Sequence, residues 1–231
     1  MPIHGDVGLS KQLLQVVSML ESSDNGAQRI VPMEPGLHEA VAILHTQLFE
    51  LHVVWAQYRQ LYADAGTVEV LNRTSGLFFK ILQDKLWDSV LLGICRMLDP
   101  AFGRGGRDKN LTLYSLLPLI NDVALKSGVE QACNDAVTSA KFAKDHRDKR
   151  IAHQDHGYAT NPALVEASAG SRQDVETALF ALRGVMQLVQ RHYNDADVLY
   201  DNTRGFVSGA EKLVAALRQL EWLKSKDGEG N

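Results

Sequence analysis

Segments with helical hydrophobic periodicity alternate along the chain with short breaks rich in glycine, proline and asparagine. Within these segments apolar residues recur every three or four positions, which is the spacing of one face of an α-helix. The pattern contains no apolar–polar alternation bounded by turn residues, so it predicts no strands. It predicts helices over residues 9–21, 37–65, 68–98, 112–126, 129–152, 172–193 and 206–224.

The residues between these segments predict where the helices begin and end. Gly66 is expected to end one helix, and Thr67 is expected to cap the next. Pro100 is expected to end that second helix, because proline cannot continue the backbone hydrogen bonding. Gly128 is expected to follow the end of the helix that contains Pro118.

Long amphipathic helices bury their apolar stripes against one another, so the predicted fold is an all-α, up-and-down helical bundle. A chain of 231 residues is long enough to bury a core of this kind. We expect an N-terminal helix and loop over 1–36 and the bundle itself over 37–195. Residues 196–231 are expected to form a C-terminal helix and tail that pack on the bundle.

Composition narrows the class of protein. Hydrophobic residues make up 45% of the chain and charged residues 23%, as in globular proteins. The net charge of −4 argues against a protein that coats nucleic acid by bulk charge, but it leaves room for a local basic patch. Cys95 and Cys133 are far apart and form no disulfide framework, which favours a reducing compartment. With no basic leader and no apolar run of about 18 residues, we expect a cytoplasmic protein without membrane contact.

One short stretch, KDHRDKRIAHQDH from Lys144 to His156, gathers basic residues and histidines. On a helical wheel Arg147 falls where the small-residue stripe of the 129–152 helix calls for another apolar residue. A charge at such a position costs several kcal/mol unless it is paired, so the pattern predicts an acidic partner. The stripe itself consists of Val129, Ala132, Cys133, Ala136, Ala140 and Ala143.

The preceding helix carries two candidate partners. Asp88 and Asp99 are both in register with the apolar stripe of the 68–98 segment. An arginine on one stripe and acids on the next predict either a structural ion pair or an arginine held rigidly to bind an anion. The pattern leaves both interpretations open. The stripe is expected to bury Thr74, Leu77, Phe78, Ile81, Leu92 and Cys95.

His153 lies six positions after Arg147, about 240° around an ideal helix, so the two residues do not share a face. They can converge only if the helix ends between them or if two chains bring their segments together. A histidine close to an arginine in a basic segment suits phosphate chemistry, because its ordinary pKa lies near neutrality.

The segment RDKRIAH, Arg147 to His153, matches the R-x(4–6)-H motif of the HEPN superfamily, with five residues between the two. The position after the arginine, which is often asparagine in that motif, is occupied by Asp148. Together with RMLDP (Arg96 to Pro100), the longer string RDKRIAHQD resembles the abortive-infection AbiU-like branch of the superfamily. The likeness covers roughly residues 37–195.

The resemblance implies a HEPN-like bundle that forms a homodimer, with both motifs facing a shared cleft. Active members are metal-independent endoribonucleases of toxin–antitoxin, antiphage or RNA-processing systems, so it implies an RNA substrate, no cofactor, no metal and a possible antitoxin partner. Arg147 and His153 would be the catalytic residues. The RNA 2′-hydroxyl would attack the adjacent phosphorus and expel the 5′-oxygen, with His153 transferring protons and Arg147 holding the phosphate.

Further residues receive supporting roles in this hypothesis. Asp148, Asp88 and Asp99 are candidates for orienting Arg147, and Arg150 and Arg96 for contacting the RNA backbone. The alternative is a non-catalytic helical module that binds RNA or protein, in which Arg147 and Asp88 form a structural pair.

The remaining histidines do not predict a metal site. His38, His45 and His52 recur every seven residues, which places neighbours about 10.5 Å apart along a helix and too far apart to bind one metal ion together. This row is expected to form a polar edge. His153 and His156 lie in a segment whose composition fixes no ligand geometry.

Overall fold

The computed structural model describes residues 32–103, 109–151, 170–194, 198, 200 and 209–228, without the side chains of residues 150, 151, 227 and 228. Within these residues the regular structure is helical, apart from one isolated bridge between Phe102 and Lys109. The predicted all-α fold is therefore confirmed.

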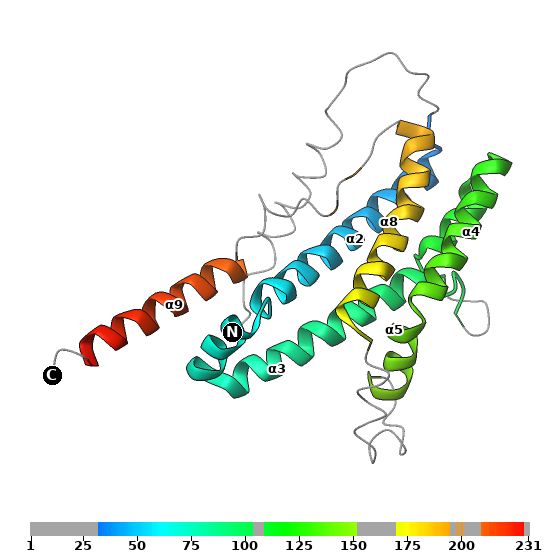
Figure 1. The fold of residues 1–231 in the computed structure, drawn as a ribbon. Coiled ribbons are helices and arrows are strands. Elements are labelled where there is room, and N and C mark those ends of the chain that lie inside the picture. Colours follow the sequence, from blue (N-terminus) through cyan, green and yellow to red (C-terminus); the bar gives the residue numbers. More distant parts are fainter. Residues whose placement is uncertain are drawn as a thin grey trace, which may run out of the picture.

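Four helices of the described chain form an up-and-down bundle (Figure 1). The end of α2 lies beside the start of α8. There the Glu176 carboxylate of α8 accepts hydrogen bonds from Trp55 (2.7 Å) and Arg59 (2.9 Å) of α2. The most extensive packing joins α4 to α8 and α2 to α3. The four helices are α2 (Pro35–Leu61), α3 (Ala65–Leu98), α4 (Val123–Ser139) and α8 (Arg172–Asn194).

Shorter elements connect and flank the bundle. A 3₁₀ segment, η1 (Leu113–Leu119), leads into α4, and α5 (Lys141–His146) with the π-helical turn η2 (Arg147–Ile151) follows it. The last helix, α9 (Gly209–Gly228), packs on α2 and α3 and projects away from the bundle (Figure 1).

The turn between α2 and α3 differs from the prediction. Helix α2 ends at Leu61, and α3 begins at Ala65 because the Asp64 side chain accepts a hydrogen bond from the Thr67 amide (2.8 Å). Asp64 rather than Thr67 is thus the N-cap, and Gly66 lies inside the first turn of α3.

The prediction of one helix over residues 112–126 is also wrong. Pro118 ends up in the 3₁₀ segment η1, whose start is fixed by a reciprocal pair of hydrogen bonds between Thr112 and Ser115. Helix α4 then starts anew, because Asp122 accepts a hydrogen bond from the Leu125 amide (2.7 Å). The helix continues through Gly128, where a glycine is tolerated at a modest cost in helix propensity.

Part of the expected stripe on α3 is not buried. Leu77, Phe78 and Ile81 are 77%, 57% and 52% exposed, whereas Cys95 further along α3 is buried. The face that carries Cys95 is covered by α5 and η2, and this cover reaches back along α3 to Asp88. Among the described residues no further layer continues over the earlier part of this face, and α2 and α9 pack on other sides of α3.

The histidine row on α2 does not form the expected polar edge. His45 and His52 are buried, and both contact the ring of Tyr200. His45 Nδ1 lies 2.5 Å from the Tyr200 hydroxyl, and the His52 ring stacks on the tyrosine. Burial and the nearby charge of Arg183 lower the pKa of His52 to about 3, so this histidine is neutral at neutral pH.

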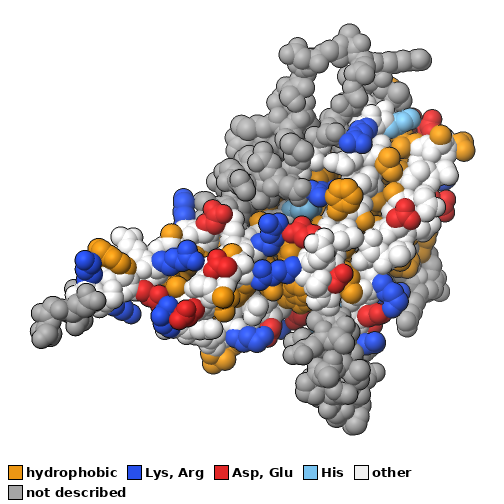
Figure 2. Space-filling model, in the orientation of Figure 1, with side chains coloured by type: hydrophobic (Ala, Val, Ile, Leu, Met, Phe, Trp, Pro, Cys, Tyr) orange, Lys and Arg blue, Asp and Glu red, His pale blue; other side chains and the backbone are white. Residues whose placement is uncertain are grey.

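On the face of the molecule shown in Figure 2, neither positive nor negative side chains form a separate patch. Lys and Arg side chains are interspersed with Asp and Glu across the face shown in Figure 2, in agreement with the small net charge. Of the described helices, none is both long and apolar enough to cross a bilayer.

Candidate functional site

The helical register breaks at Ala140, four residues before the basic stretch from Lys144 to His156 begins. The predicted continuous helix over 129–152 is wrong, because α4 ends at Ser139 and the chain continues as α5 and then as η2. At the break, the Ala140 carbonyl accepts hydrogen bonds from the amides of both Ala143 (3.0 Å) and Lys144 (3.2 Å). A π-helical turn such as η2 is rare and occurs frequently at functional sites.

Arg147, the first residue of η2, has the acidic partner that its position predicted. Its Nη1 donates to Oδ1 of Asp99 at 2.7 Å, and its Nε donates to Oδ1 of Asp148 at 2.9 Å. Asp99 is the C-cap residue of α3, so the ion pair joins the end of α3 to η2. The Arg147 side chain is 20% exposed, which leaves the guanidinium partly accessible.

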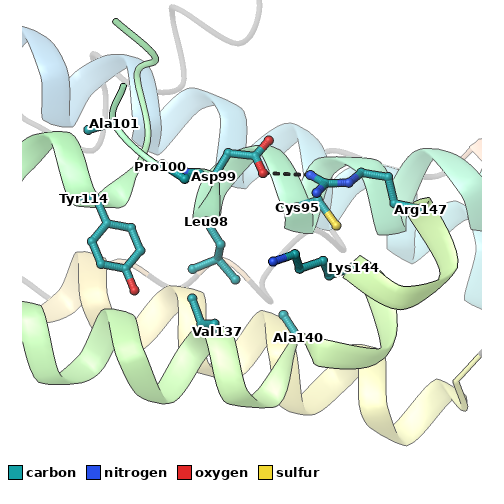
Figure 3. A pocket seen from close by; sticks show the side chains of 10 residues that line it. All are labelled: Cys95, Leu98, Asp99, Pro100, Ala101, Tyr114, Val137, Ala140, Lys144 and Arg147. Atoms are coloured by element: carbon teal, nitrogen blue, oxygen red, sulfur yellow. Dashed lines mark hydrogen bonds and ion pairs between the residues drawn. The ribbon is translucent and has the colours of Figure 1, made fainter. Parts of the chain in front are cut away.

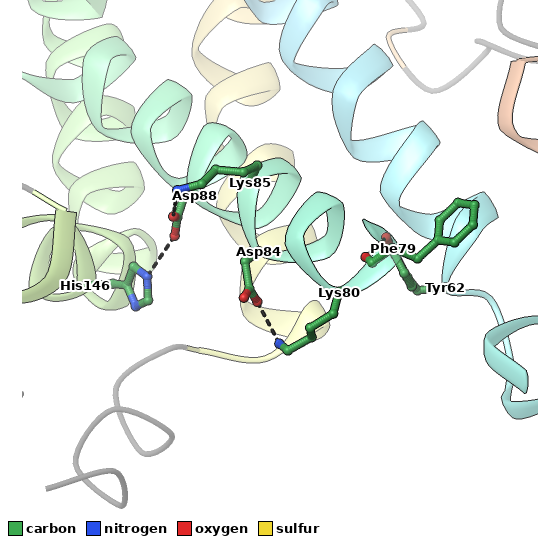
Figure 4. A network of polar contacts seen from close by, with 7 residues as sticks. All are labelled: Tyr62, Phe79, Lys80, Asp84, Lys85, Asp88 and His146. Carbon is green, nitrogen blue, oxygen red and sulfur yellow. Dashed lines mark hydrogen bonds and ion pairs between the residues drawn. The ribbon is translucent and has the colours of Figure 1, made fainter. Parts of the chain in front are cut away.

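Asp88 does not take the expected part. This carboxylate, on α3, lies 3.3 Å from Nε2 of His146, and Lys85 Nζ approaches its other oxygen at 3.8 Å (Figure 4). The predicted Arg147–Asp88 pair is therefore corrected: Asp88 contacts His146, and Asp99 and Asp148 contact Arg147. About three turns of α3 separate the two sites of contact. Both sites are reached because α5 and η2 lie along this helix from Asp88 toward its end.

His146 is the residue that the sequence reasoning missed. It is fully buried between α5 and α3, although it is adjacent in sequence to the exposed part of the basic stretch. A signal for its burial was present, since it follows the buried Ala143 by three positions, which is the spacing of one helical face. Its contact with Asp88 fixes the end of α5, from which Arg147 projects.

The two carboxylates orient the Arg147 guanidinium without using all of its donors. A guanidinium has five N–H groups, and the described contacts use two of them, which leaves three. Burial acts to lower the pKa of Arg147, but the hydrogen bonds that it donates to Asp99 and Asp148 outweigh burial and raise the pKa above its ordinary value. The group is therefore a fixed cation, and three of its donors have no partner among the described residues.

A pocket of about 430 Å³ opens beside Arg147 (Figure 3). Lys144 reaches the same end of the pocket, and no carboxylate of the described residues pairs with its ammonium. Cys95 lines the wall next to Arg147, and burial is the largest of the effects that raise the pKa of its thiol to about 11. The thiol is thus protonated at neutral pH and contributes no charge.

Arg96 lies on the other side of Asp99. It is exposed in the last turn of α3 and lines a second pocket, of about 620 Å³, together with Lys109. Asp99 lines both pockets. Arg150 belongs to η2, but its side chain is outside the described residues, as is the whole of His153.

A sequence model of the AbiU2 family of HEPN proteins matches residues 35–214 of the chain. The chain belongs to this family. The match includes the whole bundle and the stretch from Arg147 to His153, and it confirms the resemblance to the AbiU-like branch. Membership of this family relates the chain to abortive infection. Neither the curated proteins nor the solved structures contain a match to it.

The described residues of this AbiU2 family member do not gather a metal-binding group. No three His, Cys, Asp or Glu side chains within the described ranges converge as one metal ion would require. The polar chemistry of the site described above is that of a cationic guanidinium, its two carboxylates and a neighbouring ammonium.

Proposed function

We propose that the protein is a metal-independent endoribonuclease of an abortive-infection or toxin–antitoxin system and acts on RNA in the cytoplasm. The observation that carries the proposal is the Arg147 guanidinium, which two carboxylates hold in place while three of its N–H groups face no described partner. Membership of the chain in the AbiU2 family supports the same assignment.

The proposed reaction is an internal transesterification of RNA. The 2′-oxygen forms a bond to the adjacent phosphorus, the bond from phosphorus to the 5′-oxygen breaks, and the product carries a 2′,3′-cyclic phosphate. His153 accepts the proton of the 2′-hydroxyl or donates a proton to the leaving 5′-oxygen. Arg147 donates hydrogen bonds to the non-bridging oxygens, where negative charge increases in the transition state.

The carboxylates have a positioning role in this proposal. Asp99 and Asp148 remove the rotational freedom of the Arg147 side chain before RNA binds, so less entropy is lost when the phosphate is bound. Asp88 acts one step further away by holding His146, the residue that precedes Arg147. Arg96 and Arg150 are proposed to contact neighbouring phosphates of the RNA.

The proposal includes a homodimer in which both motifs face one cleft, and an antitoxin that restrains the enzyme. The dimer follows from the likeness to HEPN proteins, which implies that the two motifs face a shared cleft. Light scattering coupled to gel filtration tests it, since a strictly monomeric protein that cleaves RNA would contradict this part.

A non-catalytic helical module that binds RNA or protein is the second candidate. The observation that favours it is the ion pair between Arg147 and Asp99, because this pair links α3 to η2 and so has a structural use as well. The two candidates differ in whether the protein cleaves RNA, and therefore in whether substitution of His153 abolishes a cleavage activity.

Incubation of the purified protein with end-labelled RNA in EDTA tests the proposed function. Wild-type protein is expected to cleave and to leave 2′,3′-cyclic ends, and a 2′-deoxy substitution at the cut site is expected to block cleavage. Arg147→Ala and His153→Ala are each expected to reduce the cleavage rate by at least about 100-fold with unchanged helical content.

Arg73→Ala is the matched control, because Arg73 is an exposed arginine on α3 that pairs with Glu221 on α9, away from the site. It should cleave like the wild type. Unchanged cleavage by purified Arg147→Ala or His153→Ala would contradict the assignment, and binding of RNA without any cleavage would favour the non-catalytic module.

A further inference from the structure

The pocket beside Arg147 has a chemistry that the proposed phosphate contact does not use. Figure 3 shows the Arg147 and Lys144 side chains at one end of this pocket and the Tyr114 ring at the other. Apolar side chains form the walls between these ends, namely Leu98 of α3, Val137 of α4 and Ala140 at the junction of α4 and α5. The Asp99 carboxylate lies beside Arg147 in the same pocket.

Both ends of the pocket are fixed by contacts with other residues. Arg147 is held by its two carboxylates, and the Tyr114 hydroxyl donates a hydrogen bond to Oδ1 of Asn134 at 3.0 Å. Burial raises the pKa of Tyr114, so the hydroxyl is neutral at physiological pH. The pocket thus has a charged end, an apolar middle and a neutral aromatic end. At the charged end the Asp99 carboxylate pairs with Arg147, and Lys144 has no carboxylate partner among the described residues.

We propose that this pocket binds the nucleobase of the nucleotide whose phosphate Arg147 holds. The inference rests on the proposed function, since it takes RNA as the ligand. A nucleotide combines an apolar planar base with an anionic phosphate, and the pocket presents apolar walls beside two cations in the same arrangement. Proteins that bind single-stranded RNA commonly stack splayed bases on aromatic and apolar side chains.

Size and charge both agree with this occupant. A pocket of about 430 Å³ lies within the range of about 300–1,000 Å³ that is usual for small-molecule sites. Lys144, an exposed ammonium with no described carboxylate partner, adds a positive charge beside the phosphate that Arg147 contacts. An apolar peptide side chain would fill the walls but leave this charged end unused.

Calorimetric titration of the full-length protein with the four nucleoside 3′-monophosphates, ribose 5-phosphate and inorganic phosphate tests the inference. At least one nucleotide is expected to bind about 5- to 150-fold more tightly than either base-free phosphate, which corresponds to the usual contribution of a stacked base. Nucleotides that bind no better than ribose 5-phosphate would overturn the inference.

Val137→Trp locates the base, because Val137 is 40% exposed and forms a wall of the pocket. The variant is expected to lose the advantage of the nucleotide and to keep the affinity for inorganic phosphate. Val123→Trp is the matched control, since Val123 is on the same helix, is 82% exposed and lies outside the pocket. A nucleotide advantage that survives in Val137→Trp would overturn the location.

Val137→Phe is a milder second variant if Val137→Trp fails to give a wild-type circular dichroism spectrum. It is expected to weaken nucleotide binding while phosphate binding is retained. These measurements require no cleavage, so the two hypotheses fail separately. Absence of RNA cleavage would contradict the proposed function, whereas equal binding of nucleotide and ribose 5-phosphate would contradict the base pocket in an active enzyme.

Discussion

Arg147 Nη1 and Asp99 Oδ1 lie 2.7 Å apart, although 48 positions separate the residues in the sequence. This contact joins the end of α3 to the π-helical turn and sets the direction of the guanidinium beside the pocket. The two side chains are 20% and 37% exposed, so water screens the pair in part.

We expect Asp99→Ala to lower the free energy of unfolding by about 1–2 kcal/mol, between the values for exposed and buried ion pairs. Urea denaturation measures this change. Asp84→Ala is the control, because the Lys80–Asp84 pair on α3 is more exposed, and its removal is expected to change stability by less than about 1 kcal/mol. A double-mutant cycle with Arg147→Ala measures the coupling energy of the pair. A value near zero would contradict an interaction of the two side chains in solution.

Asp88→Leu is expected to destabilise the protein by about 1–3 kcal/mol, because it leaves Nε2 of the fully buried His146 without the carboxylate that it contacts. Asp88→Asn keeps a polar group at this position and should therefore lose less stability than Asp88→Leu. Lys85→Ala is the control, since Lys85 is 74% exposed and 3.8 Å from Asp88. Equal stabilities of Asp88→Leu and Lys85→Ala in chemical denaturation would show that the contact with His146 adds nothing.

Gly170 precedes α8 with a φ of 73°, and a Cβ atom there would clash with the ring of Phe142 on α5. We expect Gly170→Ala to destabilise the protein by about 1–3 kcal/mol, through backbone strain and the clash with Phe142. Gly184→Ala is the matched control in the middle of α8, where a Cβ meets no atom within 4 Å. It should stabilise the protein by about 0.5–1 kcal/mol, so thermal melts of the two variants should shift in opposite directions.

The buried His52 predicts how stability depends on pH. Its pKa is about 3 in the folded protein and near 6.5 in the unfolded chain, so between these values only the unfolded state binds the proton. Stability is therefore full above about pH 6.5 and falls as the pH decreases, by about 2 kcal/mol between pH 7 and pH 5. Urea titrations of wild type and His52→Gln at both pH values measure this. A slope in His52→Gln as steep as that of the wild type would assign the pH dependence to other groups.

The sequence by itself determined the helical fold, most of the bundle helices and the need of Arg147 for an acid. These follow from local information, because hydrophobic periodicity sets which face of a helix is buried and a charge on that face requires a partner. The family resemblance likewise followed from a short stretch, RDKRIAHQD, that is read directly from the chain.

Only the tertiary structure decided which acid meets Arg147. The wheel placed Asp88 and Asp99 on one stripe, but it assumed a continuous helix through Arg147, whereas the backbone breaks at Ala140 and widens into η2. Asp88 therefore faces His146, and Asp99 receives the guanidinium.

Tertiary structure also decided the exposure of Leu77 and the burial of His45 and His52. Periodicity identifies an apolar face but contains no information about where the layer that covers it ends, so the start of the α3 stripe is left exposed. In the same way, a row of histidines predicts a polar edge when only its own helix is considered. In the fold, Tyr200 packs on His45 and His52, although it is distant in sequence. Such contacts depend on which elements the whole fold brings together, and no local pattern encodes them.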